Sequence, residues 1–172
     1  MTQDWDQARA ELDVWKEAPL TDLVRHILTR YHRETRFGMA ELESLAEEAA
    51  SLEGHRFPLL LAIRDEVDLF CIEMRAHLKM EEVTLFPAIL ARDQGRAVDV
   101  KAELQDPLEL FEDEHIAAAG LLKRIRKLTN DFTPPPEAAL VQASLYEACE
   151  GLAASLARHI YLENEVLFKR MP

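Results

Sequence analysis

The sequence predicts an all-α protein, a four-helix bundle whose helices run up, down, up and down, with a short N-terminal extension. Apolar residues recur at helical spacing over long stretches of the chain. Only 5 Gly and 8 Pro interrupt 172 residues, too few for the many turns of a β-sandwich or barrel. A chain of this length is typical of one domain. We therefore expect an extension at 1–18, able to add a short helix, and a bundle at 19–172.

Breakers and capping residues divide the bundle into four helices. The expected helices run from Pro19 or Leu20 to about Ser51, from Pro58 to Ala91, from Pro107 to about Asn130, and from Glu137 to about Lys169. Asp106 is a good N-cap, and the proline after it suits the first helical position. The run Thr133-Pro-Pro-Pro136 cannot continue a helix, so it is expected to form the last link.

Charge and composition exclude several classes of function. The net charge of −12 disfavours nucleic acid, whose phosphates attract clustered Lys and Arg, and it disfavours anionic membrane surfaces. No apolar run approaches the roughly 20 residues that span a bilayer. Residues 1–10 lack the apolar centre of a signal peptide. Cys71 and Cys149 have no CxxC spacing and are expected to be small buried residues. These features predict a cytoplasmic protein with no nucleic acid or membrane partner.

An internal repeat relates the two halves of the chain. Residues 75–86 resemble residues 157–168 at an offset of 82, which aligns His77 with His159 and Glu81 with Glu163. An offset of 83 aligns His32 with His115. We therefore expect two similar helical hairpins, each with a lone His on one helix and a His-x-x-x-Glu on the other, packed with pseudo-twofold symmetry.

Each expected helix turns a histidine or a glutamate toward the apolar interior. The four apolar faces are Leu28, His32, Thr35, Met39 and Leu42; Phe70, Met74, His77, Glu81 and Leu85; Leu108, Phe111, His115, Ala118, Leu122 and Ile125; and Leu145, Cys149, Leu152, Leu156, His159, Glu163 and Val166. A buried carboxylate costs several kcal/mol unless it is paired or coordinated. The set therefore predicts a pair of metal ions bound by His32, His77, Glu81, His115, His159 and Glu163.

Iron is the metal that the donor set favours. Imidazole and carboxylate suit iron, manganese or zinc rather than copper(I) or calcium. Six ligands leave positions open on two ions, which suits redox and small-ligand chemistry, whereas structural zinc sites are closed and often use Cys. Taken singly, each of these histidines could be an ordinary core residue. His26 is expected to be exposed on a polar face and His55 lies in the first inter-helix turn, so neither is expected to bind metal.

Five stretches of sequence carry a family resemblance. They are His26-Ile-Leu-Thr-Arg-Tyr-His32, His77-Leu-Lys-Met-Glu81-Glu82 with Leu85-Phe86-Pro87, Glu112-Asp-Glu-His115, Thr133-Pro-Pro-Pro-Glu137-Ala138, and His159-Ile-Tyr-Leu-Glu163-Asn164 with Leu167-Phe168. The chain resembles the hemerythrin-like di-iron proteins, and more narrowly the RIC (repair of iron centres) family. The resemblance implies two non-haem irons, oxo- and carboxylate-bridged, on the six residues above. It also implies acidic residues near the iron at positions matching Glu73 and Glu114, which are otherwise ordinary surface carboxylates.

The resemblance implies a function in restoring iron–sulfur clusters after damage by nitric oxide or oxidative stress, by donating iron or by processing nitric oxide. The implied partners are damaged iron–sulfur proteins and small ligands such as nitric oxide or oxygen, with the chain a monomer or homodimer. RIC members often begin with a small cysteine-containing domain, and residues 1–18 do not resemble one.

Two alternatives stay open. One is a hemerythrin-like module that binds or senses oxygen or nitric oxide, although oxygen-carrying hemerythrins use an additional histidine. The other is a metal-free helical interaction protein, in which replacing Glu81 and Glu163 by Gln would leave stability unchanged or improved because buried charge is removed.

Overall fold

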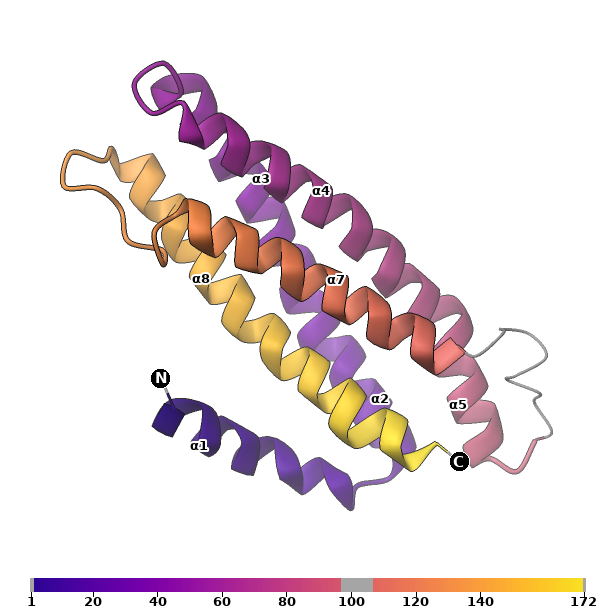
Figure 1. The fold of residues 1–172 in the computed structure, drawn as a ribbon. Helices are drawn as coiled ribbons and strands as arrows, with labels where there is room; N and C mark the ends of the chain where they lie inside the picture. The colour runs from indigo at the N-terminus through magenta and orange to yellow at the C-terminus, as the bar shows by residue number, and fades with distance from the viewer. Residues whose placement is uncertain (1, 97–106, 172) are drawn as a thin grey trace.

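The computed structural model describes residues 2–96 and 107–171, which form helices joined by short links (Figure 1). In chain order these are α1 (Thr2–Leu12), the 3₁₀ helix η1 (Asp13–Lys16), α2 (Leu20–His26), the π-helical η2 (Ile27–His32), α3 (Arg33–Glu53), α4 (Leu59–Met80), the π-helical η3 (Glu81–Leu85), α5 (Phe86–Asp93), α7 (Pro107–Leu128), α8 (Leu140–Tyr161), the π-helical η4 (Leu162–Leu167) and the 3₁₀ helix η5 (Phe168–Arg170). No strand occurs among these residues, which confirms the predicted all-α class. No helix among them is long and apolar enough to cross a membrane.

Four long rods make the bundle. The first is α2–η2–α3, the second is α4–η3–α5, the third is α7, and the fourth is α8–η4–η5. Helix α3 packs against α4 and α8, and α7 packs against α4 and α8, so the four rods close a ring around one core (Figure 1). The helix α1 lies outside this ring, in the part of the chain where the sequence allows a short helix.

The fourth helix begins later than predicted. It starts at Leu140 rather than Glu137, because the N–H of Ala138 donates to the carbonyl of Pro135 at 2.9 Å in a turn and Ala139 is extended. The chain leaves α7 through three residues with positive φ, 130–132, and α8 starts beyond the end of α7 (Figure 1). The link between α7 and α8 therefore allows His115 and His159 to lie at the same level of the bundle, although His115 is closer to the link along the sequence than His159 is. The expected N-cap Asp106 lies outside the described residues.

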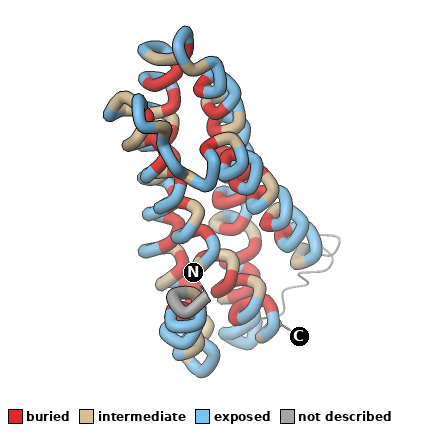
Figure 2. The backbone as a smooth tube through the Cα atoms, turned by 60° about the vertical axis from the view of Figure 1, so that its left-hand side comes forward, coloured by how far each residue is buried: buried red, intermediate tan, exposed pale blue. Residues whose placement is uncertain are grey.

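The core consists of two apolar clusters with a polar layer between them. One cluster fills the end of the bundle that holds the α3–α4 and α7–α8 links, and includes Met39, Met74 and Leu156. The other fills the opposite end and includes Tyr31 and Phe111. Along three of the rods the buried histidine falls between residues of the first cluster and residues of the second, and on the second rod Glu81 lies between Leu78 of the first and Leu85 of the second. Figure 2 shows the buried positions running along the inner faces of the helices.

The N-terminal segment covers the end of the bundle that holds the second cluster. Leu12 is buried in that cluster and Trp15 packs against it. The hydroxyl of Tyr161 donates to Asp13 at 2.5 Å, and Arg170 donates to the carbonyl of Trp15 at 3.1 Å. Helix α1 and η1 are therefore fixed to the fourth rod by polar as well as apolar contacts.

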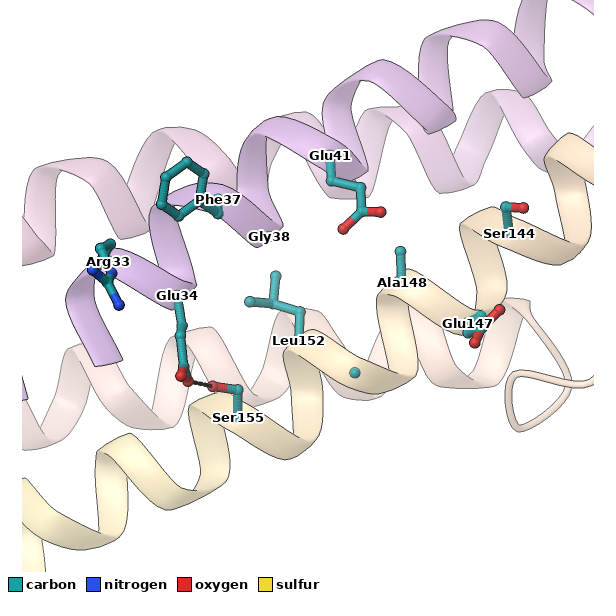
Figure 3. A pocket seen from close by; sticks show the side chains of 11 residues that line it. Arg33, Glu34, Phe37, Gly38, Glu41, Ser144, Glu147, Ala148, Leu152 and Ser155 are labelled. Carbon is teal, nitrogen blue, oxygen red and sulfur yellow. Dashed lines mark hydrogen bonds between the residues drawn. The ribbon is translucent and has the colours of Figure 1, made fainter. Parts of the chain in front are cut away.

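Helices α3 and α8 are in close contact at a glycine. A Cβ atom on Gly38 would lie 2.9 Å from Leu152 Cδ1, so the leucine occupies the space that a side chain at this position would need (Figure 3). An open groove runs beside this contact, where the hydroxyl of Ser155 donates to Glu34 at 3.2 Å (Figure 3).

Candidate metal centre

The structure brings the six predicted ligands into one buried cluster. They are His32, His77, Glu81, His115, His159 and Glu163, and none is more than 5% exposed. They come from all four rods, and they form two groups that each contain two histidines and both glutamates. Within each group one ligand atom per residue lies within 4.8 Å of the others, the spacing that a metal ion requires.

The two groups define two pairs of histidines, the His32–His159 pair and the His77–His115 pair. Glu81 lies between them and turns one oxygen toward each. Its Oε2 is 3.3 Å from His32 Nε2, and its Oε1 is 3.4 Å from His77 Nε2. This carboxylate has the geometry of a bridge between two sites.

Glu163 repeats the arrangement from the fourth rod. Its Oε1 is 2.9 Å from His159 Nε2 and its Oε2 is 3.2 Å from His115 Nε2. The Nε2 atoms of His77 and His115 lie only 3.0 Å apart, so both rings aim at the same point. All four histidines thus turn Nε2 inward and Nδ1 outward.

The electrostatics of the cluster call for positive charge. Both oxygens of Glu81, Oε2 of Glu163 and Nε2 of His32 are buried without a hydrogen-bond partner. Burial and the neighbouring Glu163 charge raise the pKa of Glu81 to about 8. Burial also opposes ionisation of Glu163, but His159, His115 and His32 hold its pKa well below the ordinary value.

The pKa of His32 is raised to about 10: burial opposes its charge, but the adjacent Glu163 and Glu81 carboxylates outweigh that effect. In the absence of metal, the raised pKa values of Glu81 and His32 both favour a bound proton, which offsets part of the buried negative charge. Divalent cations would supply it directly, and the nitrogen and oxygen donors fit iron, manganese or zinc. The residues present therefore fit a metal pair.

One of the two predicted outer acids reaches the cluster. His77 Nδ1 donates to Glu114 Oε2 at 2.7 Å, so this carboxylate fixes the orientation of the ring. Glu73 is exposed on α4 and belongs to neither ligand group.

Two further outer partners were not predicted. His32 Nδ1 donates to Glu82 Oε1 at 2.8 Å, and His115 Nδ1 donates to Asn164 Oδ1 at 2.7 Å. Arg36 holds Glu82 in turn through bonds of 2.8 and 3.0 Å. The internal repeat carried the signal, because each partner directly follows a candidate glutamate and the two lie at the repeat offset.

The three π-helical segments lie at the centre. Segment η2 ends at His32, η3 begins at Glu81, and η4 contains Glu163. A π turn inserts an extra residue and rotates the following side chains, and such turns are frequent at functional sites. In the first rod the turn buries Ile27 and leaves Leu28 only half-buried, so the predicted face is shifted by one residue there.

The other two histidines lie away from the cluster. His55 is exposed in the turn between α3 and α4. The prediction that His26 is exposed was wrong, since it is half-buried. Its ring stacks on Trp15 with centroids 4.1 Å apart and meets the edge of Tyr31 at 5.5 Å, because the N-terminal segment folds over its polar face.

Comparison with known proteins identifies the family. The model of the hemerythrin HHE cation binding domain matches residues 23–171. The chain belongs to the hemerythrin family. This hemerythrin-like chain is 31% identical over 170 residues to a probable iron-sulfur cluster repair protein of Haemophilus influenzae, a match that covers 98% of the chain and 73% of the relative. It is 33% identical over 156 residues to the iron-sulfur cluster repair protein YtfE of Escherichia coli, covering 91% and 68% respectively. The same figures apply to YtfE of Escherichia fergusonii.

These relatives confirm the resemblance to the repair branch of the hemerythrin-like proteins. The matched region contains all six residues of the buried cluster and the three outer partners. The family description gives cation binding as the shared property of the domain.

Proposed function

We propose that the chain binds two iron ions and uses them in the repair of iron–sulfur clusters. The observation that carries the proposal is the placement of two carboxylates between two pairs of histidines, with one oxygen of each carboxylate toward each pair. The proposed ligands are His32, His77, Glu81, His115, His159 and Glu163.

The ligand set suits a redox-active pair with open positions. Two imidazoles and one oxygen from each glutamate would hold each ion and would leave coordination sites for solvent, nitric oxide or oxygen. The family resemblance implies that an oxo group would join the ions as well. When bound, the irons would supply one-electron chemistry and small-ligand binding. The protein's part is to hold the ligands: Glu82, Glu114 and Asn164 orient three of the four rings from outside.

The repair function rests on the relatives, which are named iron-sulfur cluster repair proteins and are matched over most of their length. The partners that we propose are therefore iron–sulfur proteins with damaged clusters. Iron is either donated from the centre to these partners or kept in the centre during repair. One chain supplies every proposed ligand, so the metal centre can form in a monomer and in a homodimer alike.

The first test is metal content and the visible spectrum of untagged protein purified without chelators. About two irons per chain with ferric absorption are expected. The His77→Ala variant should lose both, whereas His55→Ala, an exposed histidine, is the matched control and should keep both. Folded protein that binds no iron when ferrous ion is supplied would overturn the proposed centre.

The second test is cluster repair itself. An iron–sulfur enzyme inactivated with nitric oxide is incubated with the iron-loaded protein, and recovery of its cluster absorption is followed. Recovery with the parent but not with Glu81→Gln would support the proposal. A stable, reversible oxygen adduct with no cluster recovery would instead favour an oxygen-binding module.

A further inference from the structure

The two halves of the centre are related by the internal repeat but differ in their outer partners. The repeat exchanges His32 with His115 and His77 with His159, so it exchanges the His32–His159 pair with the His77–His115 pair. Identical surroundings would make the two metal positions equivalent. Differences between corresponding outer residues therefore show how the two metal positions differ from each other.

The outer contact of one histidine is missing. In the His77–His115 pair both rings are held, by Glu114 and by Asn164. The residue that corresponds to Glu114 at the repeat offset of 83 is Tyr31. Tyr31 stacks on the ring of His159 with centroids 5.9 Å apart and leaves Nδ1 of that ring buried without a hydrogen-bond partner.

The two outer carboxylates, Glu82 and Glu114, also differ in charge environment, and this difference again favours metal binding by the His77–His115 pair. Glu82, which holds His32, also binds the guanidinium of Arg36 through both oxygens, so part of its charge is already neutralised. Among the described residues, the only ion-pair contact of Glu114 is with His77. A carboxylate that is free of a cation makes the ring it holds a stronger donor to metal.

The shared glutamates add a further reason for inequality. One divalent cation balances the charges of Glu81 and Glu163, so a second ion brings net positive charge into a buried layer unless an anion accompanies it. The first ion should therefore go to the half with the better-supported histidines.

We infer that the two metal positions are unequal, and that the position between His32 and His159 holds its ion more weakly and is emptied first. This inference rests on the proposed function and deepens it. A centre of this kind can give up one iron and keep the other. The retained ion still balances the negative charges of Glu81 and Glu163, so the bundle stays folded after transfer.

Anaerobic titration of metal-free protein with ferrous ion, followed by calorimetry, tests the inference. Because a missing outer partner typically costs 10- to 100-fold in metal affinity, two steps separated by at least about tenfold are expected. A ferrous chelator added to the loaded parent protein should remove one iron per chain in a fast phase and the second in a slow phase.

Two variants should change the separation in opposite directions. Glu114→Gln should weaken the tight step about tenfold and narrow the gap, and Glu82→Gln should weaken the loose step and widen it. Asp113→Asn, an exposed neighbour with the same loss of charge, is the matched control and should change neither step. Circular dichroism confirms that each variant is folded.

The outcomes separate this inference from the proposed function. Two equal steps and single-phase release in the parent would overturn the inequality and leave the two-iron centre standing. A loose step that weakens in Glu114→Gln while the tight step does not would also overturn the assignment. Failure to bind any iron would overturn the proposed centre itself.

Discussion

Replacing Glu81 by Gln should stabilise the metal-free protein, and the gain should grow with pH. Burial raises the pKa of Glu81 from an ordinary 4.5 to about 8. A group whose pKa is raised by folding contributes stability that is complete below pH 4.5 and is lost as the pH rises toward 8. Glutamine has nearly the shape of the protonated glutamate and does not titrate, so the variant escapes this loss.

The size of the effect follows from the pKa difference. Each pH unit above 4.5, up to the folded pKa, costs the parent about 1.4 kcal/mol of unfolding free energy. The variant should therefore be more stable than the parent by less than about 1 kcal/mol at pH 5 and by about 3 kcal/mol at pH 7. These are upper values, because His32 loses one of its two buried carboxylate neighbours in the variant.

Urea unfolding of metal-free protein at several pH values between 5 and 8 measures the difference. Glu41→Gln, an exposed glutamate on α3, is the control and should show no trend with pH. With divalent iron present the order should reverse, since the parent gains the binding free energy and the variant gains less. A stability difference independent of pH, or a variant less stable than the metal-free parent at pH 7, would contradict this prediction.

Two further predictions concern packing and burial. Gly120→Ala should raise the free energy of unfolding by about 0.5–1 kcal/mol, since a Cβ there meets nothing within 4 Å. Gly38→Ala should gain less, because its Cβ would meet Leu152 Cδ1 at 2.9 Å. Thermal melts compare the two variants, and a higher melting temperature for Gly38→Ala would contradict the prediction. Cys71 and Cys149 are buried, and burial raises the pKa of each thiol to about 12. A thiol reagent should therefore label both only after unfolding, and rapid labelling of the native protein would be the contrary result.

On two of the four rods the helical period of the sequence was enough to identify the whole buried face. On the second and fourth rods every residue of the predicted face is buried, including His77, Glu81, His159 and Glu163. A residue's position on a helix face depends only on local spacing, and burial of that face is forced by the hydrophobic effect. The repeat likewise predicted that two hairpins would bring like residues together, and the family followed from the same motifs.

How the buried groups contact one another depends on the packing of the rods in three dimensions. The four rods can rotate about their axes and shift along them relative to one another. These rotations and shifts set which oxygen of Glu81 faces which histidine and whether each ring has an outer hydrogen-bond partner. The π turns and the link before α8 set those values, and neither is evident from the apolar period. His26 shows the same limit: its face is polar in sequence, but Trp15 from a separate segment covers it. The amino-acid pattern alone was therefore enough to identify which residues form the layer between the two clusters, whereas packing between distant segments set the geometry and the asymmetry of that layer.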